Sequence, residues 1–175
     1  DNLPLIFTPF RKKVEKNSKI RNEVSELPAV KKAIINTDLQ FLVKIEVNNI
    51  INHSNTAYPF EGGERNALKR LKSYLWESHN IATYKETRNG LIGTEYSSKF
   101  SAYLSTGSIS PVTIYHEIKK FEREVKKNSS TYWLIFELMW REFFRYVAKK
   151  GKKNIFMING INGNIFNRNF NSDID

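Results

Sequence analysis

The pattern of hydrophobic positions predicts a long helix over residues 128–151. Its apolar residues recur at helical spacing, and they are Trp133, Phe136, Trp140, Phe143, Phe144 and Val147. Asn128, Ser129 and Ser130 are good caps for its start, and Gly151 suits the left-handed position just past its end. A helix of about 20 residues is about 30 Å long. Because its apolar residues cover more than one face, we expect it to be buried inside a helical domain.

Three further helices are predicted from caps and apolar stripes. Thr8-Pro9 opens a short basic helix that reaches about Lys16. Residues 62–64 precede an amphipathic stripe that ends near Trp76. Ser110-Pro111 starts another helix, whose core stripe consists of Ile114, Ile118, Phe121 and Val125.

The rest of the chain predicts less regular structure. Residues 1–60 form an irregular arm, in which 26–30 are expected to be extended, 39–47 fit either a strand or a helix, and 50–58 form a loop. The Asn- and Ile-rich residues after Gly151 predict a loop or short turns.

Composition narrows the possible partners. A net charge of +10 and a pI near 9.7 favour an anionic partner, although evenly spread lysines give the same totals. Absence of cysteine excludes disulfides and thiolate metal sites. His53, His79 and His116 lie far apart without acidic neighbours at ligand spacing, so we expect no metal site. No apolar run reaches the roughly 20 residues of a membrane span. A first residue other than Met predicts a fragment of a longer protein.

Two stretches carry candidate chemistry. Glu137 and Arg141 are four residues apart with Trp140 beside them. They form either an i,i+4 ion pair, which spacing alone favours, or a pocket wall facing a flat, polar, anionic ligand. Residues 97–111 are rich in hydroxyls, which form either a cap with a serine-rich turn, favoured by pattern alone, or a site for phosphate oxygens.

Four stretches in order, GGERNALKRL, YKETRNG, SSKFSAYLSTGSISP and STYWLIFELMWREFFR, resemble the photolyase/cryptochrome flavoproteins. YKETRNG together with the last stretch is most similar to the DASH type, and LPLIFTPFRKKVEKNSKIR resembles the segment after the antenna domain of that type. The resemblance implies a mainly helical fold. Residues 1–60 would be the linker arm, and residues 61–175 the first part of the multi-helical FAD-binding domain.

The resemblance also implies roles for individual residues. Tyr84 matches a tyrosine that contacts the flavin cofactor, and Arg88 matches an arginine that contacts DNA. The residues matching the loop that holds the FAD phosphates are Ser97, Ser98, Lys99, Phe100 and Ser101. The catalytic candidates are Glu137, which matches the acid that hydrogen-bonds the pyrimidine dimer, and Trp140, which matches the tryptophan that packs against it. Glu137, Arg141 and Phe144 would line the FAD side of this helix, and Glu137, Trp140 and Arg141 its DNA side.

The activity implied is that of a deoxyribodipyrimidine photo-lyase. Such a protein uses blue light and FAD to repair cyclobutane pyrimidine dimers, chiefly in single-stranded DNA for the DASH type. The alternatives are a non-catalytic blue-light receptor and a flavin-free, basic nucleic-acid-binding domain. A folate-type antenna chromophore and the second half of the flavin pocket are expected outside residues 1–175, so the chain alone is expected to be inactive. We expect a monomer, without membrane attachment, in the bacterial cytoplasm or a eukaryotic organelle.

Overall fold

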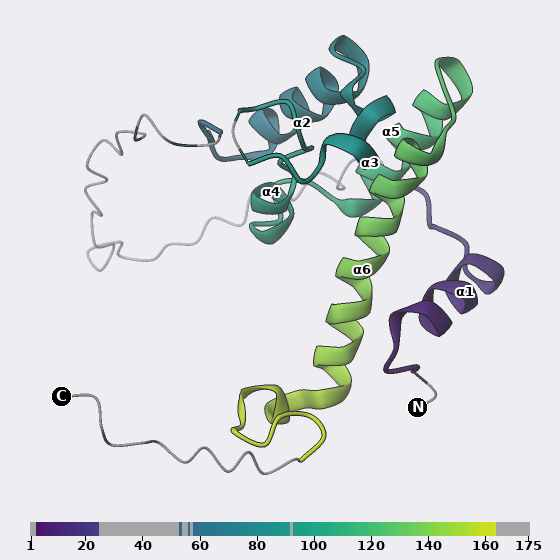
Figure 1. The fold of residues 1–175 in the computed structure, drawn as a ribbon, viewed down its shortest axis with the longest axis vertical. Helices are drawn as coiled ribbons and strands as arrows, with labels where there is room; N and C mark the ends of the chain where they lie inside the picture. Colours follow the sequence, from purple (N-terminus) through teal and green to yellow (C-terminus); the bar gives the residue numbers. More distant parts are fainter. Residues whose placement is uncertain (1–2, 25–52, 54–55, 57, 92, 164–175) are drawn as a thin grey trace, which may run out of the picture. The chain divides into compact units, whose positions relative to one another are not determined.

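The computed structural model describes residues 3–24, 53, 56, 58–91 and 93–163 (Figure 1). The expectations for residues 26–30 and 39–47, and for most of 50–58, lie outside these ranges. In the described part of the chain there is no strand, which confirms the predicted helical fold class. Its elements are α1 (Phe7–Asn17), α2 (Glu64–Lys72), the π-helical turn η2 (Ser73–Glu77), the 3-10 helix η3 (Asn80–Thr83), α3 (Tyr84–Thr87), α4 (Ser101–Ser105), α5 (Pro111–Glu124), α6 (Ser129–Gly151) and the 3-10 helix η4 (Lys152–Phe156).

The chain divides into two compact units. Unit 1 combines Asp1–Lys19 with Ile135–Asp175, and unit 2 consists of Ile20–Leu134. Helix α6 therefore contributes its first turns to unit 2 and the remainder to unit 1. Residues 61–150 were expected to be almost wholly helical, but residues 88–91 and 93–100 form turns, bends and irregular backbone between α3 and α4.

The core of unit 2 lies between α2 with its π-helical continuation and α5. Helix α5 begins where predicted, because the Ser110 hydroxyl accepts from the Val112 N–H at 3.1 Å and Pro111 occupies the first turn. Ile114, Ile118 and Phe121 are fully buried, as their stripe predicts. Val125 is not part of this core. It is 46% exposed, because the helix ends one residue before it and the backbone leaves the helical conformation there.

Unit 1 is held together by aromatic rings. Phe7 and Phe10 of α1 and Phe143 of α6 are buried in one cluster, against which Phe136 and Trp140 also pack. Helix α1 starts at Phe7, slightly before the predicted Thr8-Pro9 start, and Phe7 is one of the buried residues of this cluster.

The start of α6 is capped as predicted, and its end is not. The Asn128 side-chain oxygen accepts from the N–H groups of Ser130 and Thr131, both at 3.0 Å. Gly151, however, has φ −71°, and the left-handed residue is Lys152, with φ 49°. Glycine fits at 151 for a steric reason, since a Cβ there would lie 2.8 Å from a methyl carbon of Ile155.

Side-chain burial along α6 is uneven. Phe143 is buried as expected, whereas Trp133 and Phe136 are only half-buried and Phe144 is 61% exposed. Within the described ranges no helix is long and apolar enough to cross a membrane.

Candidate functional site

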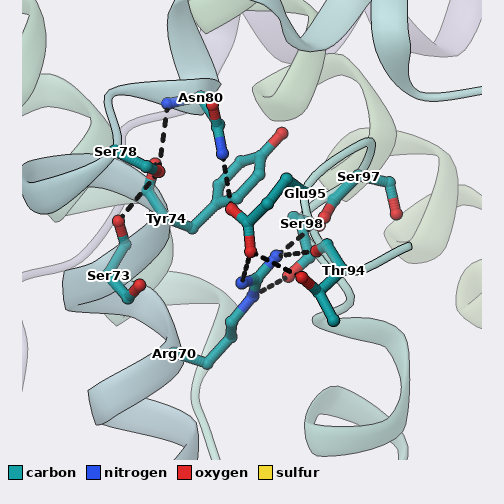
Figure 2. A network of polar contacts seen from close by, with 9 residues as sticks. All are labelled: Arg70, Ser73, Tyr74, Ser78, Asn80, Thr94, Glu95, Ser97 and Ser98. Atoms are coloured by element: carbon teal, nitrogen blue, oxygen red, sulfur yellow. Dashed lines mark hydrogen bonds and ion pairs between the residues drawn. The ribbon is translucent and has the colours of Figure 1, made fainter. Parts of the chain in front are cut away.

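A buried arginine organises the segment that precedes α4. Arg70 lies on the inner face of α2 and is only 4% exposed. Its guanidinium donates to the backbone carbonyls of Ser98 (Nε, 3.1 Å), Ser97 (Nη2, 3.0 Å) and Thr94 (Nη2, 2.6 Å), as Figure 2 shows. We call residues 94–101 the serine loop. The resemblance assigned the second half of this loop to the FAD phosphates but gave Arg70 no role.

A carboxylate balances the buried charge. Glu95 Oε1 lies 3.2 Å from Arg70 Nη1 and accepts from Thr94 Oγ1 at 2.9 Å, while its other oxygen accepts from Asn80 Nδ2 (Figure 2). Partial burial opposes the charged form of Glu95. The hydrogen bond from Thr94 and the charge of Arg70 outweigh that effect, so the pKa of Glu95 lies below its ordinary value.

The residues predicted to hold the FAD phosphates differ in their exposure and in the hydrogen bonds of their hydroxyls. Ser98 is buried, and its hydroxyl accepts weakly from the Phe100 N–H at 3.5 Å. Ser97 is half-buried and Ser101 is exposed, and neither hydroxyl bonds to a residue that the structure describes. Lys99 has φ 60°, an uncommon left-handed conformation for a residue with a side chain.

Tyr74 joins the serine loop to α3. Its ring makes edge-to-face contacts with Phe100, at a centroid distance of 6.0 Å, and with Tyr84, at 6.5 Å. The structure therefore places two of the predicted cofactor residues, Tyr84 and Phe100, around one buried ring. The Tyr74 hydroxyl is buried and has no hydrogen-bond partner among the described residues. Burial, with a further contribution from Tyr84, raises its pKa well above the ordinary value.

These features fit a phosphate-bearing ligand. Hydroxyls at Ser97 and Ser101, a cation at Lys99 and a buried phenol at Tyr74 can all donate to oxygens, and a buried donor without a partner is costly. A separate cavity of about 250 Å³ borders Arg70, and no residue of the serine loop lines it.

The predicted DNA contact, Arg88, lies on the turn after α3. Its guanidinium carbon is 5.3 Å from the centre of the Trp133 ring, and the Lys85 ammonium is 5.2 Å from the same ring. Ser130 fixes α3 against the start of α6, since its hydroxyl accepts from the Lys85 N–H at 3.1 Å and donates to Glu86 at 2.7 Å. Two cations therefore gather over one half-buried indole, which the sequence did not predict.

The remaining predicted residues lie on the unit 1 part of α6. Trp140 is stacked on Phe7, with ring centres 3.6 Å apart and planes within 9°, and Phe144 stacks on it at 5.4 Å. Arg141 forms an ion pair with its neighbour Glu142 at 2.7 Å, which the i,i+4 rule did not anticipate. Glu137 is half-buried on the same helix.

Among the described residues, no group of three or more histidines and carboxylates could hold a metal ion.

Comparison with known proteins identifies the family. No protein-family model matches the sequence. Cryptochrome DASH of Danio rerio is 43% identical over 162 residues, which cover 91% of this chain and 31% of that protein. Cryptochrome DASH of Synechocystis sp. is 40% identical over 176 residues, covering 97% and 34%. The crystal structure of a Synechocystis cryptochrome superposes with a TM-score of 0.78 at 40% identity, covering 94% of this chain and 35% of that one. The chain belongs to the photolyase/cryptochrome family.

The relatives are of the DASH type, so the resemblance seen in the sequence is confirmed. The chain spans about a third of their length. A cryptochrome DASH of Ostreococcus tauri, 41% identical over 180 residues, is named as chloroplastic/mitochondrial, so the family includes bacterial and organellar members.

Proposed function

We propose that this chain is the first part of the FAD-binding domain of a DASH-type flavoprotein that repairs cyclobutane pyrimidine dimers with blue light, chiefly in single-stranded DNA. The observation that carries the proposal is the α6 sequence with Glu137, Trp140 and Arg141, in a chain about 40% identical to cryptochromes DASH.

FAD, when bound and reduced, supplies the electron that light drives into the dimer. The protein positions it. Ser97, Ser101 and Lys99 would hold the pyrophosphate through hydroxyl and ammonium donors. Tyr84 and Phe100 would pack against the cofactor from the side of Tyr74, whose buried hydroxyl could donate to a ligand oxygen. On α6, Glu137, Arg141 and Phe144 would line the flavin.

The proposed DNA contacts use charge and a flat aromatic surface. Arg88, with Lys85 beside it over Trp133, would neutralise backbone phosphates. Glu137 would hydrogen-bond an extruded pyrimidine and Trp140 would pack against it. The Glu137 hydrogen bond would count most in the transition state, because the dimer becomes more basic when it gains an electron.

The test uses the full-length protein, purified in the dark and scanned for flavin absorbance. Oligonucleotides that contain one dimer are then illuminated, as single strands and as duplexes, with dark and undamaged controls. We expect repair that requires light, with the single strand favoured. A flavin-loaded protein that repairs neither substrate would overturn the proposal, and a protein without flavin would leave a basic nucleic-acid-binding domain.

One observation favours the non-catalytic receptor as a second candidate. Trp140, the ring expected to contact the lesion, already has Phe7 lying flat on it at 3.6 Å. Repair therefore requires a lesion that contacts another part of Trp140, or movement of Phe7. If Phe7→Ala tightened dimer binding without producing repair, the receptor function would be favoured.

The phosphate role can be tested separately. In the full-length protein, replacing both Ser97 and Ser101 by alanine should weaken FAD retention, since their hydroxyls are not used by described residues. Ser98→Ala should do less, because Ser98 is buried, whereas Ser97 is half-buried and Ser101 is exposed. Equal flavin occupancy in all three proteins would contradict the assignment.

A further inference from the structure

We infer that Arg70 is the positioning residue of the serine loop: it holds the loop carbonyls on one side so that the hydroxyls and amide N–H groups of residues 97–101 are presented to the phosphates on the other. The inference rests on the proposed function, because it needs FAD to be the ligand. Arg70 itself does not touch the ligand in this arrangement.

All three nitrogens of the Arg70 guanidinium donate hydrogen bonds within the protein. Nε, Nη1 and Nη2 together donate to three backbone carbonyls and one carboxylate. The faces of Tyr58 and Tyr74 each lie 5.0 Å from its central carbon. A guanidinium with its donors occupied in this way has little capacity left for an anion, so its effect on a ligand must pass through the loop.

Peptide geometry gives the direction of that effect. In a trans peptide the carbonyl and the following N–H point in opposite directions, and the described residues include no cis bond. With the Ser97 and Ser98 carbonyls on Arg70, the N–H groups of Ser98 and Lys99 are therefore aimed away from it. Neither N–H donates to a described residue. Lys99 is left-handed and the following Phe100 is right-handed helical, an alternation that turns successive N–H groups to one side, where the Phe100 N–H makes a long hydrogen bond to the Ser98 hydroxyl.

The loop depends on arginine in particular. A planar fork can serve carbonyls from residues 94, 97 and 98 together, whereas an ammonium is a single point of charge. The neighbouring stretch is also held, since Tyr96 packs so closely on Gly90 that a Cβ there would lie 2.6 Å from the ring carbon Cγ. Loss of Arg70 should therefore release the carbonyls of residues 94, 97 and 98, while the contact between Tyr96 and Gly90 remains.

The experiment compares Arg70→Met and Arg70→Lys with Arg65→Met in the full-length protein. Arg65 is a matched control, because it is an exposed arginine on the same helix. The first measurement is the Kd for FAD added to the apoprotein. The second is the 31P spectrum of the two pyrophosphate phosphorus atoms at saturating FAD, with the visible flavin bands recorded on the same sample.

We expect Arg70→Met to weaken FAD binding about ten- to a hundredfold, the range that follows from lost charged hydrogen bonds and unsatisfied carbonyls. We expect shifted 31P resonances with little change in the flavin bands. Arg70→Lys should be intermediate in both, and Arg65→Met should match the wild type.

A lowered melting temperature with a Kd and 31P spectrum equal to those of Arg65→Met would overturn the inference, because Arg70 would then support the fold alone. If Arg70→Met does not fold, Arg70→Lys decides: wild-type Kd and 31P spectrum would overturn the inference, and intermediate values would support it. A wild-type protein that binds no FAD would instead refute the proposed function.

Discussion

Replacing Phe7 by alanine should remove the ring that lies flat on Trp140 and loosen unit 1. Phe7 is 6% exposed, and besides the stacked contact it meets Phe136 and Phe143 edge-to-face, with ring centres 5.1 Å and 5.7 Å away. A buried Phe→Ala change costs about 3–5 kcal/mol, through lost transfer free energy and the cavity left behind. Phe7→Leu keeps most of the apolar volume and should cost about 1.5 kcal/mol.

The chain offers a matched control in Phe144, which also stacks on Trp140 but is 61% exposed. Phe144→Ala should cost about 1 kcal/mol, since an exposed ring loses only its aromatic contacts with Trp140 and Phe143. The measurement is urea unfolding of the full-length protein, followed by helix circular dichroism in the dark at fixed FAD concentration. Equal losses for Phe7→Ala and Phe144→Ala would refute the reasoning, because burial and not stacking alone is what separates them.

Three further predictions concern single side chains. Glu137→Ala should lower repair per absorbed photon more than it lowers dimer affinity, because the hydrogen bond acts in the transition state, and Glu137→Gln should have a smaller effect. An unchanged repair yield per photon would mean that Glu137 is an ordinary helix-surface residue. Arg88→Ala should weaken binding to damaged and undamaged strands alike and reduce the salt slope by about 1, measured by titration at several salt concentrations; an effect on dimer-containing DNA only would show that Arg88 contacts the lesion. Because the folded-state pKa of Glu95 is lowered, its stabilisation is present above its ordinary pKa of 4.5 and is lost as pH falls through the lower folded value. Unfolding followed between about pH 6 and pH 3 should therefore show a weaker acid dependence in Glu95→Gln, and an unchanged dependence would exclude Glu95 as a source.

Local rules predicted the elements whose determinants are local. Asn128 and Ser110 cap their helices because a side-chain oxygen reaches an N–H two or three residues away, and that reach is visible in sequence. Gly151 shows where such rules fail. The residue looked like a helix-end glycine, yet the requirement is the space taken by Ile155 and Ile161, which depends on how the chain turns back afterwards.

The candidate site likewise contains residues that the sequence predicted and one, Arg70, that it did not. Motifs supplied Tyr84, Arg88 and the serines, and Arg70 was missed although its position carried a sign. It lies on the helical stripe formed by Ala67, Leu71 and Tyr74, so a charge there had to be buried and paired. Its partners could not be predicted, because they are three backbone carbonyls and the Glu95 carboxylate, all more than twenty residues away in a segment without periodicity.

The aromatic cluster of unit 1 has a consequence for synthesis of the chain. Phe7 and Phe10 emerge from the ribosome before all of residues 20–134, and their partners on α6 follow only afterwards. At a synthesis rate of about 5–20 residues per second, the apolar side of α1 stays exposed for on the order of ten seconds before α6 is made. The lysines and arginine of α1 keep its other side strongly charged during this time, which favours a soluble chain over association with other chains. Unit 2, whose segments are contiguous, can fold in that interval, so α1 closes onto α6 as a late step.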